Sequence, residues 1–152
     1  MAFVFLFVGK TKEGFIREAL DKYVGLISRW VPVEVREIKG SDHTDRERAV
    51  EAEGDSLLSR LPQNDYIVAL DERGENPDSR HFAERLGGLS GSGRGVTFVV
   101  GGPFGLSGRV RGRADYVLSL SKLTFTHEMA RLILAEQVYR ALTIIKGKTY
   151  HY

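Results

Sequence analysis

The residues able to perform chemistry exclude several common kinds of site. The 152-residue chain has no cysteine, so it has no thiol nucleophile and no Cys-ligated zinc or iron–sulfur site. No two of its four histidines have the H-x-x-x-H spacing of a helical zinc site; they are His43, His81, His127 and His151. Ser119-Leu-Ser-Lys122 matches S-x-x-K, but it ends an apolar run and has no S-D-N or K-T-G partner. A chance match explains it better than a serine hydrolase.

Two glycine-rich segments are candidate ligand loops. Gly101-Gly-Pro-Phe-Gly105 follows a fully apolar run, where glycines let backbone N–H groups approach a ligand. A tight turn between a strand and a helix explains the same residues equally well. Gly91-Ser-Gly-Arg-Gly95 precedes a strand instead of following one, so a surface loop is the better interpretation.

His127 and the C-terminal tail are the candidates for contact with a substrate. His127 stands at the expected start of the last helix, where a histidine can contact a phosphate, or can simply be a first-turn residue. Tyr150-His151-Tyr152 follows two lysines. Such a tail can stack on bases and contact phosphates, or it can dock on the protein core.

The charge is unevenly distributed along the chain. Residues 105–152 contain eight Lys or Arg and three Asp or Glu, a balance of +5, whereas residues 1–104 have a balance of −3. A basic third on an otherwise acidic protein suggests a polyanionic partner on one face. The alternative is a solvated basic helix and tail.

The elements that must position these residues alternate between strand and helix patterns. We expect strands at 2–8, 31–38, 66–70, 96–100 and 115–119, and helices at 12–28, 44–61, near 79–86, near 107–113 and at 126–146. This alternation predicts one α/β domain over 1–152 with a mostly parallel sheet. Pro32 places the second strand at an edge. No apolar run approaches the ~20 residues of a membrane span, and the N-terminus has no signal-peptide pattern, so a cytoplasmic protein is expected.

Local details are also predicted. Thr44 and Ser79 are expected helix caps, and the third strand is expected to break at Asp71-Glu72-Arg73-Gly74. The second helix should bury its apolar positions Ala49, Ala52, Leu57 and Leu61, and the last helix Leu132, Leu142 and Ile145.

Ligands of parallel sheets bind outside the carboxyl ends of the strands. Three loops qualify here: those after Leu70, Val100 and Ser119. We therefore expect a ligand site where these loops meet.

An ordered set of segments resembles one family. The set includes Gly101–Gly105, Leu118–His127, the stretch Met129-Ala-Arg-Leu…Glu136-Gln-Val-Tyr-Arg-Ala141, and Gly147–Tyr152, with Val8-Gly-Lys10 and Ile67–Asp71 near the start. Together they resemble the RlmH (YbeA-type) ribosomal RNA methyltransferases of the SPOUT superfamily over essentially the whole chain.

The resemblance implies a methyltransferase that uses S-adenosylmethionine to methylate N3 of a pseudouridine in 23S rRNA. It implies a homodimer and a C-terminal trefoil knot, which composition and spacing do not reveal. It places cofactor contacts on Leu70, Gly101, Leu120, Ser121, Lys122, Leu123, Thr124 and Phe125. It places the RNA site on His127, Arg140, Tyr150 and His151. The base that removes the N3 proton is expected to be His127 or His151, with a preference for His151, and Arg140 and the stretch Arg109–Arg113 are expected to hold phosphates.

Two positions depart from the family pattern. Phe104 stands where the family more often has a polar or acidic residue, and Thr126 replaces the usual proline but can still cap the last helix. Phe104 keeps open the alternative of a non-catalytic ribosome- or RNA-binding relative. A small-nucleotide enzyme unrelated to RNA is disfavoured by the basic C-terminal third.

Overall fold

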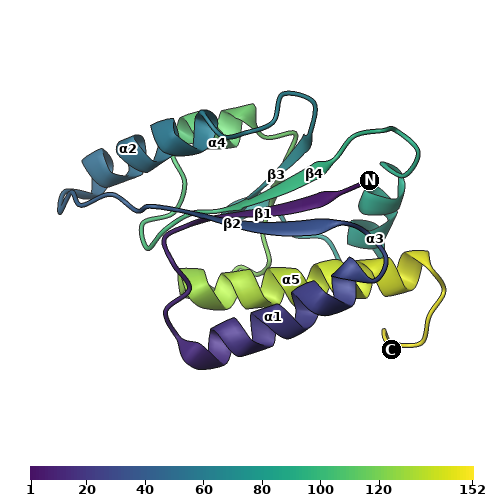
Figure 1. Ribbon diagram of the computed structural model, residues 1–152. Coiled ribbons are helices and arrows are strands. Elements are labelled where there is room, and N and C mark those ends of the chain that lie inside the picture. The colour runs from purple at the N-terminus through teal and green to yellow at the C-terminus, as the bar shows by residue number, and fades with distance from the viewer.

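A five-stranded parallel sheet lies between two layers of helices (Figure 1). The computed structural model describes all residues, 1–152. The strand order is β2-β1-β4-β3-β5, and every neighbouring pair is parallel. The strands are β1 (Phe3–Val8), β2 (Val33–Ile38), β3 (Tyr66–Glu75), β4 (Val96–Val100) and β5 (Tyr116–Leu118). The predicted α/β class is confirmed, and β2 occupies an edge as Pro32 indicated.

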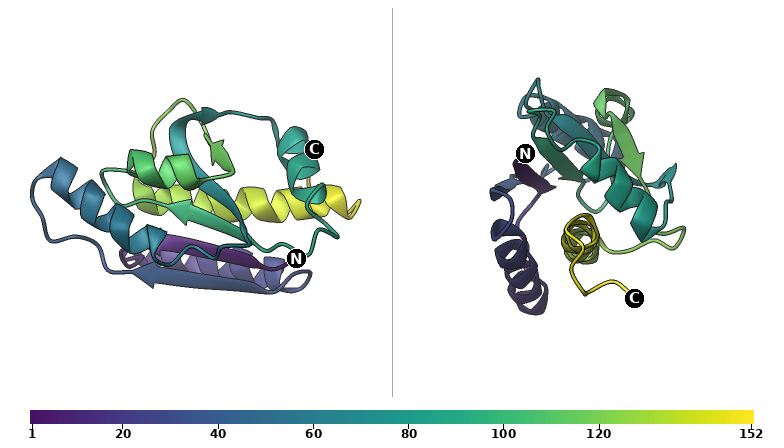
Figure 2. Two further views of the ribbon diagram at one scale, coloured as in Figure 1. Left: turned by 90° about the horizontal axis from the view of Figure 1, so that it is seen from above. Right: turned by 90° about the vertical axis from the view of Figure 1, so that its right-hand side faces the viewer.

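The helices divide between the two faces of the sheet. Helices α2 and α4 cover one face, and α1 and α5 lie side by side on the other (Figures 1 and 2), where α3 also packs on α5. Their bounds are α1 (Gly14–Ser28), α2 (Arg46–Leu58), α3 (Ser79–Gly87), α4 (Gly108–Arg113) and α5 (His127–Ile145). No helix is long and apolar enough to span a membrane.

The continuous apolar run of β1 reflects burial on both faces. Phe3, Phe5 and Phe7 point into the larger core, which includes residues of α1, α3 and α5. Leu6 and Val8 point into the smaller core beneath α2 and α4. Successive side chains of a strand alternate between faces, so a strand with both faces covered has no polar positions.

Strand β3 is longer than its sequence pattern indicates. The predicted break at Asp71–Gly74 is wrong, because β3 continues to Glu75 with a register shift in which Leu70 and Glu75 both pair with Leu118. The residues of this bulge are polar and include a glycine, and the same composition is typical of a turn. Gly74 is essential to it, since a Cβ there would lie 2.6 Å from the carbonyl carbon of Val117.

Two predicted helix caps are displaced by one residue. Asp45, not Thr44, accepts the N–H of Arg48, and Asp78, not Ser79, accepts the N–H of His81. Aspartate and the hydroxyl residues are all favourable caps, so adjacent candidates cannot be ranked from sequence alone. The predicted cap of α5 is confirmed: Thr126 accepts the N–H of Met129.

The buried faces of two helices also differ from expectation. In α2, Ala49 and Leu57 are buried, but Glu53 and Gly54 take the places expected for Ala52 and Leu61, and the helix ends at Leu58. In α5, Leu142 is buried while Leu132 is only partly buried and Ile145 is 39% exposed. Its buried face is instead formed by Arg131, Leu134, Ala135, Val138, Ala141, Leu142 and Thr143.

None of these observations tests the trefoil knot, which stays a prediction.

The close approach of β3 to β5 yields a first prediction. Replacing Gly74 with alanine should reduce the free energy of unfolding by roughly 2–4 kcal/mol, because the methyl group would meet the backbone of β5. Urea denaturation measures this. Gly25→Ala in α1 is the control: its methyl group meets no atom within 4 Å, and it should stabilise the helix by up to about 1 kcal/mol. Equal stability of the two variants would contradict the proposed contact.

Candidate functional site

The bulged end of β3 and the loops that follow β4 and β5 meet around one cavity. Its volume is about 440 Å³, and its walls come from residues 70–73, 100–106, 118, 120, 121 and 123–125, with Arg46, His127 and Ala130 at its sides. The segments after Leu70, Val100 and Ser119 therefore meet at one cavity, as expected, and its role as a ligand site stays a prediction. The cavity lies at the carboxyl edge of the sheet, as ligand sites in parallel sheets do.

The glycine segment after β4 is both a tight turn and a cavity wall. The N–H of Gly105 donates to the carbonyl of Gly102 at 3.0 Å, and Gly105 has a φ of +81°. The turn folds back so closely that a Cβ on Gly101 would lie 2.7 Å from the carbonyl of Gly105. The segment is therefore a tight turn that also exposes backbone to the cavity.

Hydrogen bonds fix the loop after β5. Ser119 is buried, its hydroxyl donates to the carbonyl of Ser121 at 2.9 Å, and its own carbonyl accepts from the side chain of Asn76 at 2.8 Å. The N–H of Leu123 donates to the hydroxyl of Ser121 at 3.0 Å. Leu123 is nonetheless 75% exposed, so this wall of the cavity presents apolar side chains to the outside.

Seven of the eight residues predicted to contact a cofactor line the cavity. They are Leu70, Gly101, Leu120, Ser121, Leu123, Thr124 and Phe125. Lys122 is exposed and does not line the cavity.

His127 lies in the same cavity, at the start of α5. Partial burial, and then the positive charge of Arg131, lower the pKa of His127 below its ordinary value. The negative charges of Glu128 and Glu53 offset part of this shift, and Lys12 adds to it. The imidazole is therefore neutral at pH 7 and has a nitrogen free to accept a proton.

A buried arginine holds the first turns of α5 against the sheet. Arg131 is fully buried and donates to the hydroxyl of Thr11 at 2.8 Å and to the carbonyl of Val8 at 2.6 Å. Its guanidinium stands 4.7 Å from the ring centroid of Phe7, and Glu37 lies 3.7 Å away. Residues 8–11 and α5 are thereby joined at the carboxyl end of β1.

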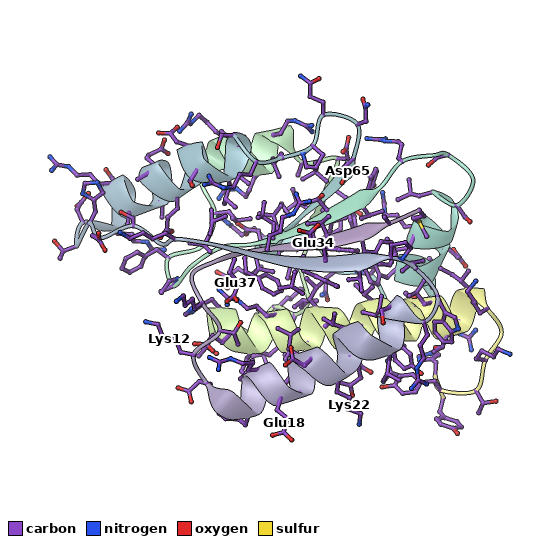
Figure 3. All side chains as sticks on the ribbon, viewed as in Figure 1. Lys12, Glu18, Lys22, Glu34, Glu37 and Asp65 are labelled. Carbon is purple, nitrogen blue, oxygen red and sulfur yellow. The ribbon has the colours of Figure 1, made fainter.

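Glu128 makes a second connection at this end of the molecule. Its carboxylate accepts the backbone N–H groups of Lys12 and Glu13 at 2.9 and 3.0 Å, where α1 has no side-chain cap of its own. Figure 3 shows Lys12 and Glu37 at this end, where α1 and α5 begin. These contacts fix the position of His127 beside the cavity.

The other three predicted RNA-site residues lie at the opposite end of α5. Arg140 forms an ion pair with Glu136 and lies 3.2 Å from Nδ1 of His151, while the Tyr150 hydroxyl donates to Glu136 at 3.0 Å. The Tyr150 ring packs edge-on against Tyr139. Burial, with hydrogen bonds to Tyr23 and Glu136, raises the pKa of Tyr150 above its usual range. The tail is thus docked on the core, the alternative that its aromatic residues left open.

His127 and this tail cluster (Glu136, Arg140, Tyr150 and His151) are separated by the length of α5. Position 140 is thirteen residues further along the helix than position 127, which at 1.5 Å per residue is about 20 Å. The structure therefore does not bring the four predicted RNA-site residues together within one chain.

The basic stretch Arg109–Arg113 is engaged in contacts within the chain. Arg109 pairs with Glu51 and Asp55 of α2. Arg111 pairs with Asp71 at 3.4 Å. These pairs join α4 to α2 and β3, so binding of phosphates by this stretch would compete with them.

Comparisons with known proteins identify the family. A family model described as "Predicted SPOUT methyltransferase" matches residues 1–151. The chain belongs to the SPOUT methyltransferase family. A protein from Desulfotalea psychrophila named ribosomal RNA large subunit methyltransferase H is 43% identical over 147 residues, which cover 96% of each chain. A protein of the same name from Thermotoga maritima is 39% identical and covers 95% of each chain.

Solved structures of more distant proteins share the fold of this SPOUT methyltransferase. A probable methylase family protein from Haemophilus influenzae is 12% identical, with a TM-score of 0.56 over 99% of this chain and 70% of that chain. The SpoU methyltransferase AviRb from Streptomyces viridochromogenes, solved in complex with AdoMet, is 14% identical, with a TM-score of 0.50 over 91% of this chain and 57% of that chain. At these identities the likeness concerns the fold alone.

The departure at Phe104 leaves the cavity of this SPOUT methyltransferase open. Phe104 lines the cavity, is 41% exposed, and its ring centroid lies 5.8 Å from the guanidinium of Arg46. An aromatic residue here adds an apolar wall without filling the space.

Sequence reasoning missed Arg131, Glu128 and Glu53. A signal for Arg131 was present, because positions 131, 134, 135 and 138 follow helical i, i+3, i+4, i+7 spacing and therefore share the buried face of α5. No comparable signal indicates that Glu53 is buried or that Glu128 caps another helix.

The environment of His127 yields a second prediction. Its imidazole should titrate below the ordinary histidine value of ~6.5 in an NMR titration, since the folded protein favours the neutral form. The lowered pKa means that the unfolded chain binds the proton more tightly, so stability is lost as the pH falls from about 6.5 to the folded-state pKa. His127→Gln should therefore be less sensitive to this pH change in thermal melts. A pKa above 6.5 would show that an acidic partner dominates.

Proposed function

We propose that this protein is an S-adenosylmethionine-dependent methyltransferase that modifies N3 of a pseudouridine in 23S ribosomal RNA. Methylation of ribosomal RNA follows from family membership and from the near full-length similarity to ribosomal RNA large subunit methyltransferase H. The observation that carries the proposal is the open cavity at the junction of the three strand-end loops. The pseudouridine and its N3 atom are inferred from the family resemblance.

The cavity fits the cofactor in size and character. Pockets for ligands of this size occupy roughly 300–1,000 Å³ and combine apolar walls with a few polar groups. Here Leu70, Leu120 and Phe125 supply apolar surface, and the glycine turn exposes backbone. The proposed cofactor contacts are Leu70, Gly101, Leu120, Ser121, Lys122, Leu123, Thr124 and Phe125. The related AviRb was solved with the same cofactor.

The chain's own residues contribute position and proton transfer. When bound, S-adenosylmethionine supplies an activated methyl group on a sulfonium sulfur, which becomes a neutral thioether once the methyl group has left. Most of the rate enhancement then comes from alignment of the acceptor atom. As the N3–methyl bond forms, N3 must lose its proton, and the neutral imidazole of His127 can accept it. His151, the preferred base from the sequence, becomes the second candidate, because it lies outside the cavity and its Nδ1 is 3.2 Å from Arg140.

A homodimer resolves the separation within α5. The tail cluster of one subunit cannot reach its own His127 across about 20 Å of helix, but it can lie over the cavity of a partner. Exposed apolar side chains support a subunit contact, among them Phe15, Leu123 and Phe125 at 66%, 75% and 40% exposed. In this arrangement Arg140 contacts RNA phosphate, and Tyr150 or Tyr152 stacks on the displaced base.

The remaining proposals concern the whole chain. The match of the family model to residues 1–151 supports a single domain, and ribosomal RNA as substrate supports a cytoplasmic location. A non-catalytic RNA-binding relative is not favoured by any observation, because Phe104 leaves the cavity open.

Ribosomal RNA from a strain lacking the gene tests the function directly. Mass spectrometry should show the loss of one methyl group from a pseudouridine of 23S RNA, and incubation of the purified protein with those ribosomes and S-adenosylmethionine should restore it. An unchanged modification pattern would exclude this substrate, and methylation at another atom or nucleotide would correct the assigned target.

Mixing two defective subunits tests whether one site contains His127 of one subunit and the tail of the other. His127→Ala and a truncation after Lys146 should each be inactive, yet their mixture should recover about a quarter of wild-type activity, since half of the dimers would be mixed and each would have one complete site. A mixture that stays inactive after subunit exchange would place the whole site within one chain.

Arg140→Ala tests whether this residue serves the RNA and not the cofactor. It should lower methylation and leave S-adenosylmethionine affinity within about twofold.

A further inference from the structure

Glu53 is a buried carboxylate without a cationic partner. It is 7% exposed, and one oxygen accepts the N–H of Ser41 at 2.9 Å. The other oxygen, Oε1, has no hydrogen-bond partner, and none of the ion pairs of the chain includes Glu53. An unpaired buried charge is costly, so its retention calls for a cation that the chain itself does not provide.

The unpaired oxygen lies directly behind the wall of the cavity. A Cβ placed on Gly102, which lines the cavity, would be 3.3 Å from Oε1 of Glu53. Helix α2 packs closely against the start of α4 because Gly54 has no side chain: a Cβ there would be 2.6 Å from the hydroxyl of Ser107, which follows the cavity wall in the chain. Absent side chains at positions 54 and 102 thus allow the carboxylate to approach the cavity.

The field of this carboxylate reaches the interior of the cavity. Glu53 is one of the charges that raise the pKa of His127, which lines the cavity from α5. By contrast, Asp71 at the cavity edge is already paired with Arg73 and Arg111. Glu53 is therefore the buried negative charge beside the cavity whose potential no ion pair cancels.

We propose that Glu53 determines specificity for the charge of the cofactor, so that the cavity favours the cationic sulfonium of S-adenosylmethionine over the neutral thioether of S-adenosylhomocysteine. The proposal rests on the cavity being the cofactor site. Attraction acts through the low-dielectric wall at Gly102 and is selective, because transfer of the methyl group removes the positive charge from the sulfur. The product is then held less tightly than the donor by the amount of this attraction.

Isothermal titration calorimetry on Glu53→Gln separates this role from a structural one. The amide keeps the shape of the side chain and an oxygen for the N–H of Ser41, but it has no charge. The Kd for S-adenosylmethionine should rise about tenfold while that for S-adenosylhomocysteine changes less than about twofold. An analogue that carries a CH–NH₃⁺ group in place of the methylsulfonium should lose affinity as S-adenosylmethionine does. Equal losses for all three ligands, or no loss for any, would overturn the proposal.

Glu47→Gln is the matched control, because it removes the same charge from an exposed position of the same helix. Both affinities should stay at their wild-type values in that variant. If Glu53→Gln fails to fold, Glu53→Asp and Glu53→Asn replace it as a pair of equal length that differs in charge. The aspartate variant should keep a higher ratio of S-adenosylmethionine to S-adenosylhomocysteine affinity than the asparagine variant, and equal ratios would contradict the role of charge.

The same titrations distinguish two kinds of failure. A wild-type protein that binds neither ligand would refute the cavity as the cofactor site. A wild-type protein that binds both, with a ratio unaffected by the charge at position 53, would refute the role of Glu53 alone.

Discussion

The parallel direction of all five strands is the constraint on which the site depends. Strands β3, β4 and β5 are adjacent and parallel, so the segments at their carboxyl ends lie at one edge of the sheet and enclose one cavity. These segments are separated by about thirty and twenty residues of sequence. The enclosure also requires backbone to pack against backbone. Gly74 against Val117 and Gly101 against Gly105 are positions where a single methyl group would force the walls apart.

Helix α5 divides the proposed functional residues into two groups. Its first turns are held to the end of β1 by Arg131 and Glu128, which place His127 at the cavity. Its last turns hold the tail through Glu136 and Arg140. A rigid helix keeps these groups apart, so one complete site needs either a second subunit or two separate roles for the two ends. Buried polar groups thus determine the position of catalytic candidates in this fold more directly than the apolar core does.

Charge is arranged differently on the surface and behind the cavity wall. Surface cations such as Arg109 have carboxylate partners from neighbouring elements, which neutralise much of the basic C-terminal third. Glu53 and Arg131 are buried from opposite helical layers near the end of β1, and each has one polar atom without a partner. An enzyme whose methyl donor loses a positive charge in the reaction can use an unpaired carboxylate such as Glu53 to distinguish the donor from the product.

Much of the architecture could be read from the amino-acid sequence. Apolar runs and helical periodicity indicated the order of all ten elements, the parallel class and the three loops at the ligand edge, because these depend on interactions between near neighbours in the chain. The errors have local causes as well: β3 continues through a polar bulge at Asp71–Gly74, and Asp45 caps α2 in place of the adjacent Thr44. Only the tertiary structure decided that Glu53 is buried and that Arg131 bonds to Thr11 and to the carbonyl of Val8. Those properties arise where residues distant in sequence pack together, such as Thr11 and Arg131, which are 120 positions apart. The spacing of residues within one segment does not encode which distant segment will cover it.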